Sequence, residues 1–300
     1  MDKKELAVMV AQILSTMEPQ VKGSDYKPTE PGPEPRPTEH SPGDFVPDIT
    51  ELDLRKLYLT EGAKDPEGFR RLKARTPARL GSGRAGPRYK TVTMLRFRAD
   101  HAAAQDAVFS EAPEDFAREN GMTEVRTRCH DKEEYLTRPD LGRCFDEQNT
   151  KVIRGVIPGS PRVQLVVGDG LSSAAITANA MDCLESIREG LKLRGIDPGT
   201  PIFVRYCRVG AGDAIGDITG CELVCMLEGE RPGLVTDKSM SAYITYMPRT
   251  GVSESSRTVV SNIHAQGTPA VEAGAHIAQL LDTFLRKKLS GVGLQLEAGL

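Results

Sequence analysis

The sequence predicts an α/β fold with a Rossmann-like, mostly parallel sheet, preceded by a mainly helical region and a disordered N-terminal linker. From about residue 152, short apolar runs alternate with helical patterns, which is typical of strands joined by crossover helices. Residues 49–150 show mainly helical spacing. Residues 18–48 are rich in proline and charge, so they cannot bury enough apolar surface to fold.

The first 17 residues form a separate pattern. Acidic residues at positions 2 and 5 and a short apolar stretch exclude a secretory signal. We predict an amphipathic helix that docks on another partner through the flexible linker 18–48; the alternative is that it packs on its own domain. The apolar residues with helical spacing are Leu6, Met9, Val10, Ile13, Leu14 and Met17.

Residues 49–150 are expected to form a mainly helical region that packs on the core. The spacing predicts a helix over 90–109 and a short strand over 122–128. Two basic, glycine-containing loops lie at 81–88 and 136–143. These loops are our first expectation for a partner interface; the alternative is that they bind carboxylates of their own domain.

Residues 151–300 are expected to form the Rossmann-like domain. The last helix should open at Thr268, with Pro269 in its first turn, and end at Gly291. In such sheets ligands bind at the carboxyl ends of the strands. The predicted strands cover residues 163–167, 201–209, 222–227 and 242–246, and the predicted intervening helices end near residues 194 and 219.

Composition excludes several classes of function. The net charge is −3, basic residues are not concentrated in one segment, and tryptophan is absent, so nucleic acid is not an expected partner. The six cysteines form no CxxC pair, which predicts reduced thiols and no metal site. No apolar run reaches the roughly 20 residues of a membrane span.

Two glycine-bearing turns are candidate ligand loops. The turn 168–173 follows a predicted strand, but Ser173 replaces the last glycine of a dinucleotide fingerprint, so a plain tight turn is an equal alternative. The turn 229–234 also follows a strand and offers Glu230 as an acceptor and Arg231 as a donor. Its alternative is a surface turn with a local Glu–Arg pair.

A third segment, Asn-Ile-His-Ala-Gln-Gly at 262–267, is close to the D-x-H-x-x-G pattern in which histidine coordinates cobalt. Asn262 replaces the aspartate that would orient and charge-balance the histidine. We therefore expect His264 to be a hydrogen-bonded loop histidine. No nucleophile–histidine–acid set is visible in the sequence, and we predict no catalytic residue and no metal ligand in this chain.

Six strings in one order then give the chain a specific resemblance. The strings are GRAGPR at 83–88, YLTRPDLGR at 135–143, VVGDGLSSAAITAN at 166–179, FVRYCRV at 203–209, GERPGL at 229–234 and SNIHAQGTPAVEA at 261–273. Through them the sequence between about residues 75 and 289 resembles the small subunit of ethanolamine ammonia-lyase, a carbon–nitrogen lyase that converts ethanolamine into acetaldehyde and ammonia.

The resemblance implies a non-catalytic subunit. In this family the large subunit is a TIM barrel that holds substrate and radical chemistry, and adenosylcobalamin lies base-on between the two subunits. The family's cofactor contacts fall on Val209, Glu230 and Val259, the last being cysteine in the best-known members. The resemblance further implies a hetero-oligomer of six copies of each subunit, in the cytoplasm and inside a bacterial microcompartment whose shell or cargo the N-terminal helix would bind.

Two other functions are weighed against this one. A stand-alone Rossmann oxidoreductase would need an intact nucleotide fingerprint, which the sequence lacks. An adaptor protein of a microcompartment would explain residues 1–48 and leave the rest of the sequence unexplained.

Overall fold

The computed structural model describes residues 48–76 and 78–297, with side chains as far as residue 294. All of these residues belong to one compact unit that begins at residue 47. The predicted N-terminal helix (1–17) and all but the last residue of the predicted linker (18–48) lie outside the described residues.

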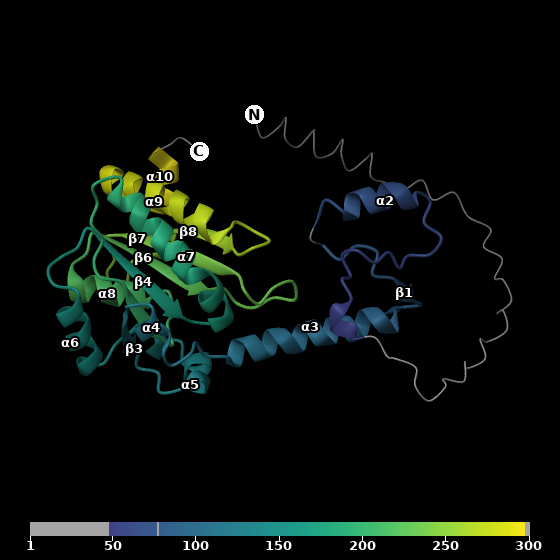
Figure 1. Ribbon diagram of the computed structural model, residues 1–300, viewed down its shortest axis with the longest axis horizontal. Helices are drawn as coiled ribbons and strands as arrows, with labels where there is room; N and C mark the ends of the chain where they lie inside the picture. Colours follow the sequence, from purple (N-terminus) through teal and green to yellow (C-terminus); the bar gives the residue numbers. More distant parts are fainter. Residues whose placement is uncertain (1–47, 77, 298–300) are drawn as a thin grey trace, which may run out of the picture. The chain divides into compact units, whose positions relative to one another are not determined.

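Residues from Thr123 onward contain a six-stranded sheet with the order β3-β5-β4-β6-β7-β8 (Figure 1). The first four strands in this order are parallel, whereas β7 and β8 join antiparallel. This arrangement confirms the predicted α/β class with a mostly parallel sheet. The strands are β3 Thr123–Arg126, β4 Val163–Asp169, β5 Ile202–Arg205, β6 Leu223–Gly229, β7 Met240–Tyr246 and β8 Arg257–Ile263.

Helices cover both faces of the sheet (Figure 1). On one face α7 (Ser173–Lys192) and α9 (Ala270–Lys287) pack together against a core that includes Leu165, Leu227 and Ile244. On the other face α6 (Glu147–Val156) and α8 (Ala211–Thr219) cover a second core around Val166, Val204 and Met226. Because side chains alternate along a strand, consecutive buried residues supply both cores.

The region before the sheet is mainly helical. The helix expected over 90–109 is present as α3, and β3 lies within the expected strand at 122–128. β3 pairs with β5, so this earlier region supplies the edge strand of the sheet. The domain boundary at 150 remains a prediction. The other elements are η1 Ile49–Glu51, α2 Pro66–Lys73, β1 Arg84–Ala85, β2 Arg88–Tyr89, α3 Thr91–Phe109, α4 Phe116–Glu119, α5 Lys132–Thr137, η2 Leu141–Arg143 and, near the C-terminus, α10 Val292–Glu297.

Three elements differ from the expectation. The strand expected over 201–209 ends at Arg205, because Tyr206 takes a left-handed backbone with φ 58°. The helix expected to be the last, α9, begins at Ala270, not Thr268, and ends before Lys288, which is left-handed with φ 56°, so Gly291 is not its cap; α10 follows it. β8, together with the η3 turn Glu254–Ser256 before it, was not expected.

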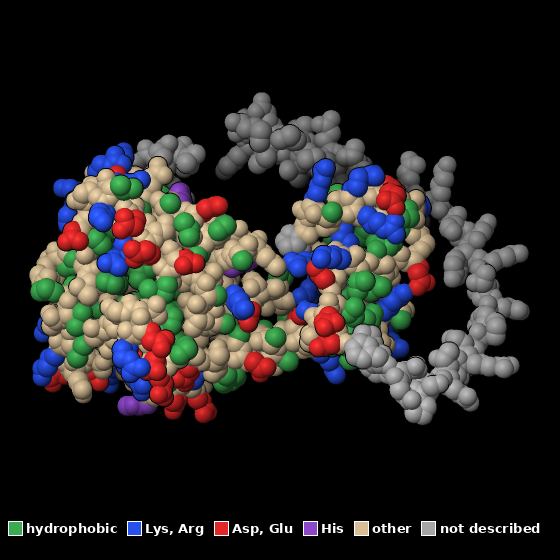
Figure 2. All heavy atoms as spheres, in the orientation of Figure 1, with side chains coloured by type: hydrophobic (Ala, Val, Ile, Leu, Met, Phe, Trp, Pro, Cys, Tyr) green, Lys and Arg blue, Asp and Glu red, His purple; other side chains and the backbone are tan. Residues whose placement is uncertain are grey.

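The cysteines and the distribution of surface charge can be compared with the composition. All six cysteines are free. Basic and acidic side chains are interspersed over the described residues that face the viewer in Figure 2. Among the helices of the described residues, none combines the length and apolar character needed to cross a membrane.

A buried ion pair joins the antiparallel strand β8 to helix α8. Arg257, in β8, donates from Nη1 and Nη2 to the two carboxylate oxygens of Asp213, at 2.8 and 2.6 Å. Both side chains are less than a tenth exposed. Arg257 also donates to Thr245 of β7 and to Glu254, and its bonds to Asp213 and then to Glu254 raise its pKa. The pair therefore fixes the outer strands against the helix that covers them.

We predict that Asp213→Asn lowers the free energy of unfolding by about 3–5 kcal/mol, because it leaves a buried guanidinium without its main counter-charge. Urea unfolding of the purified chain measures the change. Asp282→Asn is the matched control, since it removes a more exposed pair with Arg286 and should cost less than about 1 kcal/mol. Equal effects of the two substitutions would contradict the prediction.

Candidate functional site

The carboxyl ends of the neighbouring strands β4 and β6 lie side by side, at the point where the chain's crossover connections leave in opposite directions. From β4 the chain passes through α7 to β5 on one side, and then through α8 to β6 on the other. This switch point is where open α/β sheets form a ligand crevice. Here the crevice is tight: a Cβ on Gly229 would lie 2.1 Å from the Ser172 carbonyl oxygen, and one on Gly170 would lie 2.7 Å from Glu228 Oε1.

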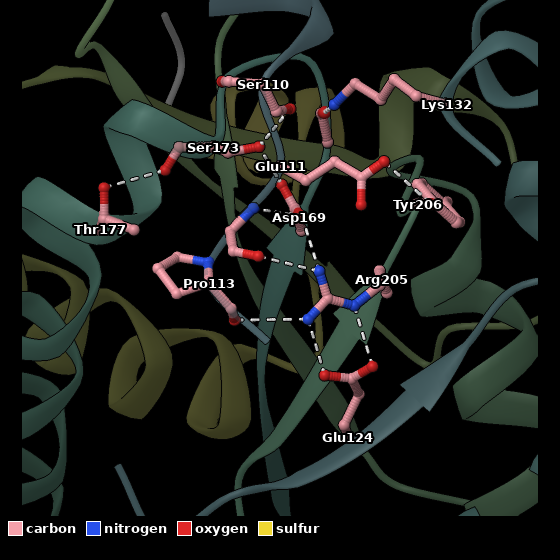
Figure 3. A network of polar contacts seen from close by, with 12 residues as sticks. Ser110, Glu111, Pro113, Glu124, Lys132, Asp169, Ser173, Thr177, Arg205 and Tyr206 are labelled. Atoms are coloured by element: carbon pink, nitrogen blue, oxygen red, sulfur yellow. Dashed lines mark hydrogen bonds and ion pairs between the residues drawn. The ribbon is translucent and has the colours of Figure 1, made fainter. Parts of the chain in front are cut away.

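Next to this point, the chain's own segment 110–113 covers the ends of β4 and β5 (Figure 3). Arg205 donates from Nη1 to the Ala112 carbonyl at 3.0 Å, and from Nε and Nη2 to Glu124, both at 2.8 Å. Asp169 Oδ2 accepts the Ala112 N–H at 3.1 Å. Arg205 is 4% and Asp169 1% exposed, so this network belongs to the interior.

Other polar groups of the turn 168–173 also form hydrogen bonds within the chain. The Ser173 hydroxyl lies 2.5 Å from Asp169 Oδ1 and 2.8 Å from the Ser110 carbonyl, with one proton to share between them. Ser172 caps α7 by accepting the Ala175 N–H. The ammonium group of Lys132 donates to the Gly170 carbonyl at 2.8 Å. These contacts favour the plain-turn alternative for this segment.

A second buried cluster lies on the α8 side of the same edge. Glu228 is 6% exposed, and its Oε2 has no hydrogen-bond partner among the described residues. Burial raises the pKa of Glu228 to about 8, against the attraction of Arg208. Arg208 donates to the Tyr135 carbonyl at 2.8 Å and lies over the Tyr135 ring, while its backbone N–H binds the Gly142 carbonyl. The loop 136–143 is thus tied to its own domain next to Val209.

Glu230, directly after β6, has a different environment. Its Oε1 accepts the Ser241 hydroxyl at 2.6 Å and the Asn262 N–H at 2.9 Å. Burial opposes ionisation, but the hydrogen bonds from Asn262 and Ser241, the nearby Ser239 hydroxyl and His264 together outweigh it and lower the pKa of Glu230. Both of the closest bonds end on Oε1. The local Glu230–Arg231 pair, the sequence alternative, does not form among the described residues.

The other two predicted residues, Val259 and Val209, lie in a strand and in a connecting segment. Val259 in β8 pairs with Tyr243 of β7 and is 48% exposed. Burial and the nearby Glu228 raise the pKa of Tyr243, and Glu230 adds to this effect, so these groups lie close together. Val209 lies in the segment between β5 and α8, two residues before that helix begins. Val259 and Glu230 are thus on strand β8 and at the end of strand β6, whereas Val209 is in a connection at the carboxyl end of β5.

His264 uses both ring nitrogens within the chain. Its Nδ1 accepts the Gln266 N–H at 3.2 Å, so Nε2 carries the proton and donates to Asn262 Oδ1 at 2.8 Å. Asn262 holds a left-handed backbone with φ 64°. This is the hydrogen-bonded loop histidine that the sequence indicates. The described residues contain no group of three potential metal ligands.

Two cavities are relevant to ligand binding. The larger, about 740 Å³, lies between the C-terminal part of α7 and the loop before β5, at the amino ends of the strands. A cavity of about 500 Å³ lies next to Glu230, at the carboxyl end of β6. We give the second more weight, because parallel sheets bind ligands at their carboxyl ends.

Sequence reasoning missed Glu228, Arg208 and Ser241 as parts of this edge. Arg208 precedes Val209 inside a recognised string, which was the one available signal. Glu228 resembles an ordinary acid at the end of a strand, and Ser241 reaches Glu230 only through the pairing of β6 with β7.

Comparison with known proteins is consistent with this geometry. Residues 66–295 match the family model described as ethanolamine ammonia-lyase light chain (EutC). An ethanolamine ammonia-lyase small subunit from Clostridium perfringens is 53% identical over 98% of this chain and all of its own length. Small subunits from Clostridioides difficile and Listeria innocua are 59% and 58% identical, over 83% of this chain and 85% of theirs.

We predict that Glu228 makes stability depend on pH. Its pKa rises from an ordinary value of 4.5 to about 8 on folding, so between these values the folded chain holds a proton that the unfolded chain releases. The free energy of unfolding should fall as pH rises through this window, by at most about 1.4 kcal/mol per pH unit, and level off above it.

Glu228→Gln should remove this fall, because the amide does not titrate. Urea unfolding from pH 5 to 9 measures it, with the exposed Glu114→Gln as control. A constant difference between Glu228→Gln and the unsubstituted chain at every pH would contradict the assignment.

Proposed function

The chain belongs to the family of ethanolamine ammonia-lyase small subunits, and we propose that it covers adenosylcobalamin against the large subunit of that lyase. As a small subunit it works with a large one. The observation that carries the cofactor role is Glu230, a half-buried carboxylate that its hydrogen-bond donors keep ionised at the carboxyl end of β6.

The chemistry of this edge fits the periphery of a corrin. Corrin side chains end in amides, whose N–H groups donate to carboxylates as charge-assisted bonds. Because Glu230 stays ionised, its carboxylate offers such an acceptor. Val209, which is partly buried, and the half-exposed Val259 supply apolar contact around it. A valine at 259 excludes a thiol-specific role there and retains an apolar contact.

The proposed role requires no catalytic side chain from this subunit. Bound adenosylcobalamin supplies the radical chemistry, and the protein supplies position and exclusion of water. In this proposal the large subunit holds ethanolamine, while Glu230 and the two valines hold the cofactor from the opposite side. The base-on state is supported by His264, whose two nitrogens are both engaged within the chain.

The rival functions gain less support. A nucleotide-dependent oxidoreductase would use the turn 168–173, but the polar groups of Asp169, Ser172 and Ser173 are bonded within the chain. An adaptor protein would not need an ionised, half-buried carboxylate on the sheet edge. We further propose six copies of each subunit, in the cytoplasm and inside a microcompartment, as the family resemblance implies.

We predict that Glu230→Ala weakens cobalamin binding by the complex of this chain with its large subunit by about ten- to hundredfold, because a hydrogen bond to a charged acceptor is lost. Absorbance titration of the reconstituted complex with cobalamin measures the Kd. The isolated chain, assayed in parallel, should not turn over ethanolamine.

Glu272→Ala, which removes an exposed acid at the start of α9, is the control and should leave the Kd unchanged. Circular dichroism checks that the Glu230 variant remains folded. An unchanged Kd for Glu230→Ala would sink the assignment of this residue, and a complex that binds no cobalamin would sink the proposed function.

The last part of the proposal concerns residues 1–17. A predicted helix this short is marginal in water, so it would gain order by laying its apolar stripe on a shell or cargo surface. Deleting residues 1–17 should leave lyase activity intact but release the enzyme from microcompartments. Polar substitution of Leu6, Val10 and Leu14 should do the same, measured as the fraction that co-sediments with purified compartments.

Changes at Lys4 or Gln12, outside the stripe, should have little effect. Full encapsulation of the truncated enzyme would contradict the targeting role. Loss of solubility and activity on truncation would show that the segment belongs to the subunit's own core or to its oligomer contacts.

A further inference from the structure

Residues 68–99 contain ten lysines and arginines and neither an aspartate nor a glutamate. The net charge of −3 for the whole chain conceals this segment, so the expectation that basic residues are not concentrated in one segment does not hold for it. The segment comprises most of α2, the β1–β2 hairpin and the N-terminal half of α3. A local excess of positive charge must be balanced by the rest of the chain, by solvent ions or by a partner.

The chain itself balances only half of these charges. Four of the ten side chains form ion pairs with nearby carboxylates, and Lys73 is buried and donates to two backbone carbonyls. The four paired side chains are Arg70, Arg79, Lys90 and Arg96. The other five are exposed arginines without an ion pair in the part of the chain that the structure describes, namely Arg71, Arg75, Arg84, Arg88 and Arg98.

Three of these arginines lie beside exposed apolar side chains on the hairpin and α3. The Tyr89 ring meets the Phe97 ring edge-on, with 5.4 Å between centroids, which joins the hairpin to the helix. On α3, Met94, Leu95 and Arg98 lie within about one turn of each other. We call this set the arginine surface, and its exposed members are Arg84, Arg88, Tyr89, Met94, Leu95 and Arg98.

The two basic loops considered as partner interfaces differ in this respect. In the loop 136–143, Arg138 donates from Nε and Nη2 to Asp140, at 3.1 and 2.9 Å, so a carboxylate of its own domain neutralises it. In the loop 81–88, Arg84 donates to the Pro87 carbonyl at 3.0 Å and lies over the Tyr89 ring. These contacts fix the side chain but leave its charge unbalanced. The loop 81–88 is therefore the stronger candidate for a partner contact.

The region that carries the arginine surface has little core of its own. Within residues 48–76 and 78–98, Leu54 is the only apolar side chain that is less than a tenth exposed. Leu72, by contrast, is 63% and Leu95 46% exposed. A small unit buries too little apolar area to be stable by itself, so a partner that covers these side chains would stabilise it.

The chemistry of the surface suits a protein partner that presents carboxylates. Arginine, tyrosine and methionine are enriched in protein interfaces, and the guanidinium fork binds a carboxylate through two hydrogen bonds. The family model begins at residue 66, the first residue of α2, so the arginine surface belongs to the part of the chain that matches other small subunits. The partner that small subunits share is the large subunit, whereas the tail proposed to bind a shell lies before residue 66.

We propose that the arginine surface docks on the large subunit, which presents carboxylates to Arg84, Arg88 and Arg98. Apolar side chains of the large subunit cover Tyr89, Met94 and Leu95. The inference rests on the proposed partnership with a large subunit and goes further, because it assigns the contact to particular residues of the hairpin and α3 and not to the loop 136–143.

The test measures the Kd of the full-length chain for the purified large subunit by analytical ultracentrifugation. The double substitution Arg84→Gln and Arg88→Gln should weaken binding by about ten- to hundredfold, because two carboxylates of the partner lose their counter-charges. Raising the salt concentration from about 0.1 M to about 0.5 M should weaken the unsubstituted complex more than the variant complex, because screening acts on charges that the variant lacks.

Arg138→Gln is the matched control, since it removes one exposed arginine from the other basic loop, and it should leave the Kd unchanged. Arg84→Lys with Arg88→Lys keeps both charges but loses the forks, so its Kd should lie between those of the glutamine variant and the unsubstituted chain. Thermal unfolding of each full-length variant checks the fold, which substitutions of exposed side chains should leave intact.

The outcomes separate this inference from the proposed function. If the unsubstituted chain binds the large subunit and the double glutamine variant binds it equally well, the docking assignment is wrong and the proposed function stands. The assignment is also wrong if Arg138→Gln weakens binding as strongly, or if the double substitution only dissociates a dimer of this chain. If the unsubstituted chain does not bind the large subunit at all, the proposed function fails as well.

Discussion

The buried guanidinium of Arg205 is the constraint on which this edge of the sheet depends. A charge in the interior must be paired and hydrogen-bonded, or it destabilises the fold by several kcal/mol. Its partners come from β3, from the carbonyls of segment 110–113 and, at 3.8 Å, from Asp169 at the end of β4. Satisfying Arg205 therefore joins the edge strand β3 to the sheet and holds that segment over the ends of β4 and β5 (Figure 3).

Segment 110–113 covers the carboxyl ends of β4 and β5 and leaves the other half of this edge, from β6 to β8, for a ligand. The crevice at β4 and β5 is filled by the chain itself, whereas β7 and β8 extend the sheet antiparallel beyond β6. An antiparallel pair can expose one face, and in β8 Val259 is exposed while the next residue, Val260, packs against the core. A half-buried acid and exposed apolar side chains then lie together, which suits a large amphiphilic ligand better than a small one enclosed in the core.

Local sequence patterns predicted most of the helices and strands. Features that depend on contacts between residues far apart in the sequence were not predicted. The helix over 90–109 and the apolar strands β4 and β6 follow from periodicity. Strand β8 was missed because only one of its faces is packed and its sequence reads as a polar loop. The early end of β5 depends on the left-handed Tyr206, whose hydroxyl donates to Glu111, 95 residues away. Glu230 could be named from the sequence through resemblance, but its partners Ser241 and Asn262 required the sheet.

Asn262 shows how the site keeps Glu230 ionised. Its left-handed backbone directs an N–H to Glu230 Oε1, and its side chain accepts from His264. Asparagine tolerates this conformation better than most residues. An aspartate would keep the bond to histidine, but it would place a second carboxylate beside Glu230, and repulsion would raise the pKa of that acid. The asparagine that departs from the cobalt-ligand pattern thus helps to keep Glu230 charged.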